Sequence, residues 1–269
     1  MKHYKRALTI AGSDPSGGAG IQADLKTFSA CGCYGMSAIV AVVDENTVGV
    51  TGVHPVPVEF VTGQMRSVLD DIGADAVKIG MLHSSELIRA VRDTLERYAI
   101  RNVVLDPVMV ATSGDKLLQD EAVETLRTEL IPRVRVITPN IPEAEILLGH
   151  KIDRQEELPE LAEALSCGGT VSVLLKAGHL EDEELVDVFY NAEKKSTLLL
   201  RSKRLQTRNT HGTGCTLSSA VAAFLARGLE LDDAVSRAKT YIDTAIRKGA
   251  DYEIGHGHGP VHHFHDFWE

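Results

Sequence analysis

The stretch RNTHGTGCTLSSAVAAFLARG, residues 208–228, sets a polar segment and two glycines directly before a run of small and apolar residues. The spacing of that run predicts a helix over 214–227. Backbone N–H groups at a helix N-terminus have no partner within the helix, so such a position attracts anions. The stretch therefore predicts a site for a phosphate or a developing oxyanion, although a glycine-rich turn without a ligand has the same pattern.

Apolar, β-rich runs alternate with amphipathic stretches along the rest of the chain, which is the pattern of βαβ units around a mainly parallel sheet. Strands are predicted over 7–12, 36–43, 75–81, 102–110, 134–140 and 170–178, with a late antiparallel hairpin of 186–191 and 196–202. Helices are predicted over 21–31, 58–72, 86–100, 121–131, 142–148, about 155–167, 214–227 and 231–249. No linker, internal repeat or low-complexity segment interrupts the pattern. We therefore expect a single α/β domain over 1–269.

Length and composition exclude several classes of protein. The chain has 269 residues, is 43% hydrophobic and has a net charge of -10, which argues against a nucleic-acid or membrane-surface binder. The apolar run before Gly12 is shorter than the roughly 7–15 residues of a signal peptide, and no stretch approaches the roughly 18–20 needed to cross a bilayer. The four cysteines form no CxxC pair. We expect a cytoplasmic protein with reduced thiols.

Polar segments follow most of the predicted strands. In open parallel sheets, ligands bind outside the carboxyl ends of the strands, so these segments should gather at one edge and form an active site. The segments are AGSDPSGGAG, VDENT, KIGM, LDPVM, TPNIPE, KAGH and NTHGTGC.

Three side chains at these strand ends suit phosphate chemistry. Asp106 and Glu143 could hold Mg²⁺ over the phosphates of a nucleotide, or they could be a cap and a salt bridge. Lys176 could offset phosphate charge, or it could simply be an exposed lysine. The chain lacks both GxxxxGK[ST] and GxGxxG, so phosphate binding would use neither of those loops.

Cys215 stands at the start of the predicted helix, where the helix dipole favours a thiolate. It could be a nucleophile, a general base or an inert small residue. A hydrolase would need a base such as His211 beside it, and the four-residue spacing does not demonstrate that.

Asp24 follows Gly20 by four residues and could bind a substrate amino or hydroxyl group, or it could favour the helix dipole. A methionine such as Met81 is more often a core residue than a ligand contact. Five of the eleven histidines lie within 256–265, but their spacing matches no standard zinc pattern.

Taken together, these segments resemble the hydroxymethylpyrimidine/phosphomethylpyrimidine kinases of thiamin biosynthesis, within the ribokinase-like superfamily. The resemblance covers nearly the whole chain, from ALTIAGSDPSGGAGIQADLKTFSA through KIGML, VVLDPVM, ITPNIPEAE and KAGH to NTHGTGCTLSSA and the His-rich GHGPVHHFH. It implies a three-layer α/β/α sandwich, usually a homodimer. It also implies that ATP with Mg²⁺ phosphorylates the hydroxymethyl group of the aminopyrimidine, and then the monophosphate to the diphosphate.

The resemblance also implies roles for residues at matching positions. HGTGC would be the anion hole, with the amides of Gly212 and Gly214 facing the transferring phosphoryl group and Lys176 beside it. Cys215 stands where related sugar kinases have a catalytic aspartate, so it could take the proton, or the site could act by positioning alone. The remaining roles are Mg²⁺ binding for Asp106 and Glu143, nucleotide-phosphate binding for Asn140, Lys176 and Thr210, and the pyrimidine pocket for Gly12, Asp24, Glu45, Met81 and Val108.

One departure bears on the substrate. The family commonly has A-Q-N-T where this chain has D-E-N-T, residues 44–47. A glutamine both donates and accepts, whereas the carboxylate of Glu45 only accepts unless it is protonated. Glu45 could bind the pyrimidine amino group or a protonated ring edge more strongly, or it could shift the preference.

The alternative function is a kinase of pyridoxal, pyridoxine or pyridoxamine, since related enzymes share the HGxGCT loop, and dual activity is compatible with the same residues. A non-catalytic ligand sensor on the same fold is a second alternative, but the intact set of Asp106, Glu143, Lys176 and HGTGC speaks against it. A cysteine hydrolase acting through Cys215 is weaker still.

Overall fold

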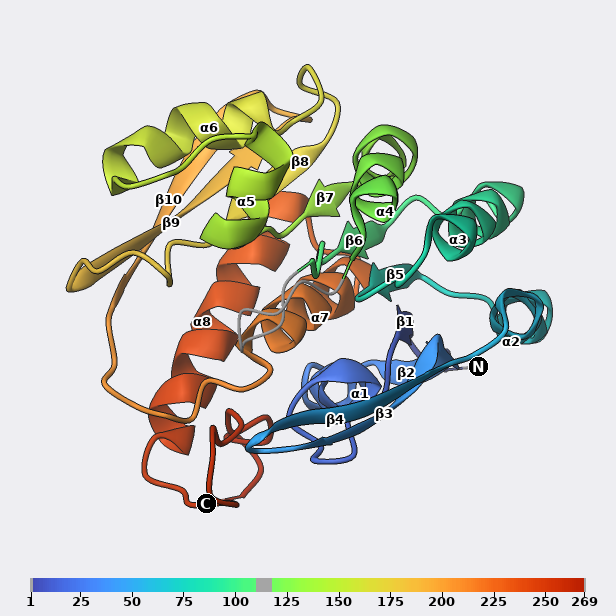
Figure 1. Ribbon diagram of the computed structural model, residues 1–269, viewed down its shortest axis with the longest axis horizontal. Coiled ribbons are helices and arrows are strands. Elements are labelled where there is room, and N and C mark those ends of the chain that lie inside the picture. The colour runs from blue at the N-terminus through green and yellow to red at the C-terminus, as the bar shows by residue number, and fades with distance from the viewer. Residues whose placement is uncertain (1, 110–117, 269) are drawn as a thin grey trace.

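The computed structural model describes residues 2–109 and 118–268 and contains an eight-stranded sheet with helices on both faces (Figure 1). The sheet order is β10-β9-β8-β7-β6-β5-β1-β2, and β3 and β4 form a separate two-stranded ribbon. The strands are β1 (Arg6–Ala11), β2 (Tyr34–Ile39), β3 (Ala41–Asn46), β4 (Gly49–Pro55), β5 (Ala76–Ile79), β6 (Val103–Leu105), β7 (Val136–Ile137), β8 (Ser172–Leu175), β9 (Glu184–Asn191) and β10 (Ser196–Lys203).

Strands β2, β1, β5, β6, β7 and β8 pair in parallel, and β9 and β10 are antiparallel. The expected mainly parallel sheet with a late antiparallel hairpin is therefore confirmed. The helices are α1 (Gly20–Ala30), α2 (Val58–Asp71), α3 (Ser85–Arg97), α4 (Asp120–Thr125), α5 (Ile141–Leu148), α6 (Leu158–Ala164), α7 (Thr213–Ala226) and α8 (Leu231–Gly249), and a π-helical turn, Leu126–Leu130, extends α4.

The alternation of side chains along the strands produces two apolar cores. Leu8 and Ile10 of β1 face the side covered by α2 to α6, whereas Ala7 faces the side covered by α1, α7 and α8. Helix α7 is buried along its length from Thr216 to Ala226, because it packs against β1, β5 and β6 as well as α1 and α8. Its small residues allow this close approach, and its N-terminus lies at the carboxyl edge of the sheet.

The predicted strand over 36–43 is wrong in one respect. Strand β2 ends at Ile39, and the chain leaves the main sheet at Val40, whose N–H donates to the carbonyl of Ala11. The continuation is β3, which pairs with β4 in the ribbon (Figure 1). The ribbon carries exposed valines such as Val42 and Val48, so it has no core of its own. Of the predicted strand over 102–110, β6 keeps only Val103–Leu105, and Val110 lies outside the described residues.

Candidate active site

Asp106 and Lys176 are brought together at the carboxyl edge of the sheet. Lys176 Nζ lies 3.1 Å from Asp106 Oδ1, and both side chains are largely buried. Thr138 Oγ1 donates to the same oxygen over 2.9 Å. Burial opposes ionisation of Asp106, but the ammonium groups of Lys176 and Lys78 outweigh it and hold the pKa of this carboxyl below its ordinary value. The pair is therefore charged.

The two positions in HGTGC require glycine for different structural reasons. Gly212 has φ of 75°, and a Cβ there would lie 1.7 Å from the carbonyl oxygen of Gly18, so another residue would force the loop apart. A Cβ on Gly214 would lie 3.3 Å from Lys176 Nζ and 3.4 Å from Asp106 Oδ2. The first turn of α7 thus faces the Asp106–Lys176 pair directly. Thr210 lies just before this turn, where its carbonyl accepts from Thr213 Oγ1 over 2.7 Å, and is exposed.

Glu143 and Asn140 lie beside this pair at the start of α5. Asn140 pairs with Lys176 in a parallel bridge after the strands end. Glu143 N donates to Asn140 Oδ1 over 2.9 Å, and Asn140 N donates to Glu143 Oε2 over 2.8 Å, which is a capping box. Burial raises the pKa of Glu143 to about 7, against the attraction of Lys176 and with added repulsion from Asp106. Two carboxyl groups and one ammonium therefore face the same space.

A second buried ion pair lies beneath the site, and sequence reasoning missed half of it. Lys78 of β5 is fully buried, and its Nζ lies 2.9 Å and 3.0 Å from the two carboxylate oxygens of Asp24. Thr9 Oγ1 and Ser219 Oγ each donate to Asp24 over 2.6 Å. Asp24 is thus enclosed by protein groups, and the structure does not bring it to the surface of the cleft. A lysine inside the apolar run DAVKIGM was the signal that could have revealed this pair.

Cys215 lies within electrostatic reach of both ion pairs. Burial raises the pKa of its thiol to about 11, and the lowering by Lys78 is opposed by Asp24 and Asp106. Burial thus opposes the thiolate that the helix N-terminus favours, and little thiolate is expected at neutral pH. His211 is not bonded to Cys215 in the described part of the chain, which removes the base that a hydrolase would need.

Residues predicted for the pyrimidine pocket meet next to the ribbon. A Cβ on Gly12 would lie 3.6 Å from Met81 Cε and 3.7 Å from Val43 Cγ2, so all three adjoin one space. Val108 follows Asp106 by two residues, with its N–H donating to the carbonyl of Asp106 over 2.8 Å. Glu45 follows Val43 by two residues on β3 and so lies on the same face of the ribbon.

Glu45 belongs to a cluster with Asp14 and His211 that sequence reasoning did not assemble. His211 Nε2 lies 2.8 Å from Asp14 Oδ2 and 3.9 Å from Glu45 Oε1. Asp14 comes from the loop after β1, and His211 from the loop before α7. The cluster therefore joins the ribbon to both loops that border the site.

The His-rich tail serves packing. His263 Nε2 lies 3.0 Å from Thr216 Oγ1 in α7, and the ring of His262 lies between Tyr252 and Trp268. No group of three or more metal-ligating side chains occurs in residues 2–109 and 118–268.

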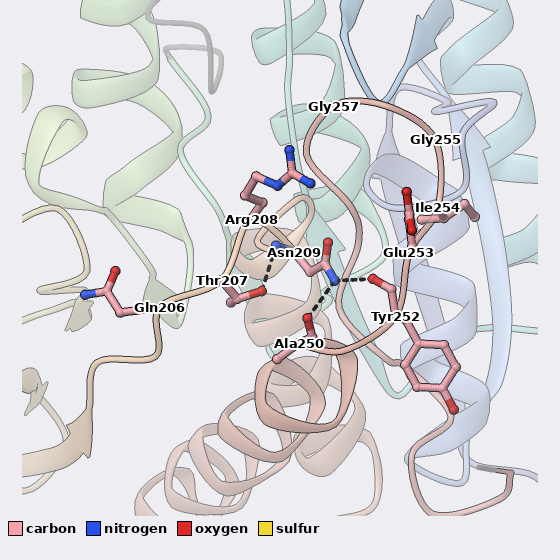
Figure 2. A pocket seen from close by; sticks show the side chains of 10 residues that line it. All are labelled: Gln206, Thr207, Arg208, Asn209, Ala250, Tyr252, Glu253, Ile254, Gly255 and Gly257. Atoms are coloured by element: carbon pink, nitrogen blue, oxygen red, sulfur yellow. Dashed lines mark hydrogen bonds between the residues drawn. The ribbon is translucent and has the colours of Figure 1, made fainter.

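The tail also borders a cavity of about 540 Å³, lined by residues from 206–209 and 250–257. Figure 2 shows Asn209 in it, with its amide bound to the carbonyls of Ala250 and Tyr252. None of the site residues predicted from the sequence lines this cavity.

The fold and the site together define a class. A mainly parallel sheet between two helical layers, with a glycine-bounded helix N-terminus facing an Asp–Lys pair, is a ribokinase-like kinase, as expected. Over the described residues, no helix has the length and apolar character required to cross a bilayer.

The particular family follows from comparison with known proteins. The family model described as phosphomethylpyrimidine kinase matches residues 14–262, and the chain belongs to this family. The hydroxymethylpyrimidine/phosphomethylpyrimidine kinase of Escherichia coli is 50% identical over 97% of this chain and 98% of its own length. That of Rhizobium meliloti is 52% identical over 98% of both chains.

Solved structures agree with the fold. A phosphomethylpyrimidine kinase from Clostridium difficile has a TM-score of 0.79 and 44% identity, covering 90% of this chain and 99% of its own. The pyridoxal kinase of Staphylococcus aureus, in complex with AMP-PCP and pyridoxal, has a TM-score of 0.88 and 34% identity, covering 99% and 96%. The expected kinase class is thereby confirmed, with a vitamin B6 kinase among the structural relatives.

Proposed function

We propose that this protein uses ATP to phosphorylate 4-amino-5-hydroxymethyl-2-methylpyrimidine and then its monophosphate, giving the diphosphate for thiamin biosynthesis. The observation that carries the proposal is the approach of Gly214 to the Asp106–Lys176 pair, which brings a helix N-terminus and an ammonium group to one point. Relatives of that printed function at 50–52% identity support the choice of substrate.

The phosphoryl group would be transferred mainly by positioning and charge. The amides of Gly212 and Gly214 would bind its oxygens, and Lys176 would offset its negative charge. Asn140 and Thr210 flank this position and would contact the nucleotide phosphates. Because the reaction needs charge stabilisation more than covalent chemistry, no side chain has to form a bond to phosphorus.

The donor set at this end fits Mg²⁺. Asp106 and Glu143 supply carboxylate oxygens near Lys176, and Mg²⁺ is usually held by one or two carboxylates with phosphates and water. When bound, Mg²⁺ would neutralise charge on the phosphates.

At the other end, Gly12, Met81 and Val108 would line the pyrimidine pocket, and Glu45 would face the ring from the ribbon. Asp24 would contribute indirectly, by holding Lys78 beneath the first turn of α7. Cys215 would lie next to the hydroxymethyl group as a protonated thiol, so we assign it to positioning and not to proton removal.

Three further proposals concern the whole protein: a single domain, a homodimer and a cytoplasmic location. Two layers of helices around one sheet support the first. Unpaired thiols support the last, because none of the cysteines forms a disulfide. The homodimer is proposed from the family resemblance alone.

The alternative, a pyridoxal kinase, is favoured by the 34% identical relative. Mg²⁺-dependent ATP consumption with hydroxymethylpyrimidine, its monophosphate and pyridoxal separates the two. Turnover of both pyrimidines would support the proposal, whereas turnover chiefly of pyridoxal would replace it. The absence of turnover with all three would favour the ligand sensor.

A further inference from the structure

On the ribbon side of the site, two carboxyl groups lie against one imidazole. Asp14 and Glu45 both face His211, at 2.8 Å and 3.9 Å from its Nε2. Ser16 Oγ lies 3.5 Å from the same nitrogen. The side chains of these three charged groups are between 1% and 19% exposed, so water screens them poorly.

Asp14 is the group that stays ionised. Its carboxylate accepts from the backbone N–H groups of Ser16, Gly18 and Ala19, at 2.8, 3.0 and 2.7 Å. Burial works against ionisation, but these bonds and His211 hold the pKa of Asp14 well below its usual value. Its charge therefore persists and acts on the neighbours.

Glu45 is the group that can take up a proton. Burial and the nearby charge of Asp14 raise the pKa of Glu45, while His211 opposes the rise. Burial lowers the pKa of His211, but Asp14 and Glu45 outweigh it and raise the pKa above its ordinary value. Lys26 also attracts the carboxylate of Asp14, and its Nζ donates to Gly17 O, while His263 is bonded to Thr216. Neither of them pairs with Glu45 in the described chain.

The geometry of the ribbon directs Glu45 at the pocket and not at solvent. Val43 and Glu45 share one face of β3, and Val43 adjoins Gly12 and Met81. The irregular pairing near Glu45 skips a residue of β4, because Asp44 pairs with Gly52 and Glu45 with Val50. The alternation along β3 is therefore intact, and Asp44 lies on the opposite, exposed face.

We propose that Glu45 selects the aminopyrimidine as a neutral carboxylic acid, so that substrate binding takes up a proton from solvent. The carboxyl O–H donates to a ring nitrogen, and the carboxyl C=O accepts from the adjacent amino group. The ring nitrogen and the amino group form an acceptor–donor pair, which a carboxylate alone would meet with one repulsive contact. The added proton converts that contact into a hydrogen bond, with no change in the covalent bonds of the substrate.

This inference rests on the proposed function, since it requires an aminopyrimidine in the pocket. It explains how an acid can stand where the family commonly has an amide, because a neutral carboxyl offers both a donor and an acceptor, as an amide does. It also predicts a pH dependence that an amide would not have. Above the pKa of Glu45, each unit of pH weakens binding of the pyrimidine by about tenfold.

The test compares wild type with Glu45→Gln, and uses Asp44→Asn as the matched loss of one charge on the opposite face of the ribbon. Binding of hydroxymethylpyrimidine without ATP is measured by calorimetry at pH 8.5 in phosphate and in Tris, whose ionisation enthalpies differ. We expect uptake approaching one proton per pyrimidine for wild type and Asp44→Asn, and almost none for Glu45→Gln. In steady-state assays with ATP, the KM for the pyrimidine should rise by up to about tenfold per pH unit in the first two and stay nearly level in Glu45→Gln.

Equal proton uptake in wild type and Glu45→Gln would overturn the inference, as would the absence of uptake in wild type. Loss of uptake in Asp44→Asn would also overturn it, because the effect would then follow overall charge. These results leave pyrimidine turnover, and hence the proposed function, intact. If wild type neither binds nor phosphorylates hydroxymethylpyrimidine, the proposed function falls and the inference falls with it.

Discussion

Two buried lysine–aspartate pairs lie at the carboxyl edge of the sheet, and they differ in what surrounds them. Lys78 and Asp24 have no exposed side-chain surface, and protein hydroxyls complete the contacts of Asp24. Lys176 is 14% exposed, and its partner Asp106 faces the glycine at the start of α7. The position in the strand explains the contrast: Lys78 lies inside β5, whereas Lys176 follows the end of β8. In the register of the sheet Lys78 is level with Ser172, so Lys176 lies four residues further toward the carboxyl edge, where its pair is at the opening of the site.

The largest expected effect is on stability at the enclosed pair. Lys78→Met leaves Asp24 buried without its cation and should lower the free energy of unfolding by about 3–5 kcal/mol. Urea denaturation measures this loss. Arg127→Met is the control, since Arg127 and Glu124 form a pair that is 52% and 58% exposed and should lose less than about 1 kcal/mol. Equal losses in the two variants would mean that the Lys78–Asp24 pair contributes no more than an exposed one.

A substitution in the open Asp106–Lys176 pair should affect turnover instead of stability. Lys176→Met removes a cation from the proposed phosphoryl position, so kcat should fall by about 10²- to 10³-fold, with little change in KM for the pyrimidine. Steady-state ATP consumption measures both constants, with Lys151→Met as the control at a lysine that is 81% exposed. If kcat fell less than threefold, Lys176 would be structural like Lys78, and the comparison would fail.

A smaller effect is expected in how stability depends on pH at Glu143, which lies beside the open Asp106–Lys176 pair. The pKa of Glu143 is raised to about 7 in the folded protein, so the folded state holds this proton more tightly than the unfolded state. The stability from this group is therefore present below the unfolded value of about 4.5 and is lost as pH rises to about 7. Glu143→Gln keeps the shape of the cap but not the proton. Between pH 5 and 7.5, wild type should lose up to about 3 kcal/mol relative to the variant in urea unfolding. Parallel stability curves for the two proteins would refute the raised pKa.

The smallest expected effect is on the kcat of a Cys215 variant, although Cys215 lies within electrostatic reach of both pairs. With a thiol pKa of about 11, little thiolate exists at neutral pH, so Cys215→Ala should lower kcat by less than about tenfold. Single-turnover measurements of phosphoryl transfer test this value directly. A loss of about 10²-fold or more would instead identify the thiolate as the base.

The strand ends were predictable because the rule that governs them is local. Each of Asp106, Asn140 and Lys176 follows an apolar run, and parallel strands bring their carboxyl ends to one edge whatever their order. The ribbon was not predictable in the same way. Its first strand continues the apolar run of β2, and the break at Val40 is seen only in the pairing of β3 with β4.

The contacts within the charged clusters were harder to predict from the sequence. Asp14 stands within the quoted segment AGSDPSGGAG, but its three backbone bonds arise only when the loop closes on the start of α1. His211 was considered as a partner of Cys215, four residues away, yet it pairs with Asp14, 197 residues away. Proximity in the chain was therefore a poor guide to which side chains pair.

The sequence by itself determined the alternation of strands and helices, the glycine-bounded start of α7 and the placement of acids and a lysine at strand ends. These follow from hydrophobic periodicity and from glycine, which act over a few residues. Only the tertiary structure decided which charges pair and which remain open. The partners of Lys78 and Lys176 lie 54 and 70 residues away, and the nearby carboxylates outweigh burial and raise the pKa of both lysines. Burial and charge pairing are properties of the assembled sheet edge, because the low dielectric that makes them strong exists only after the chain has folded.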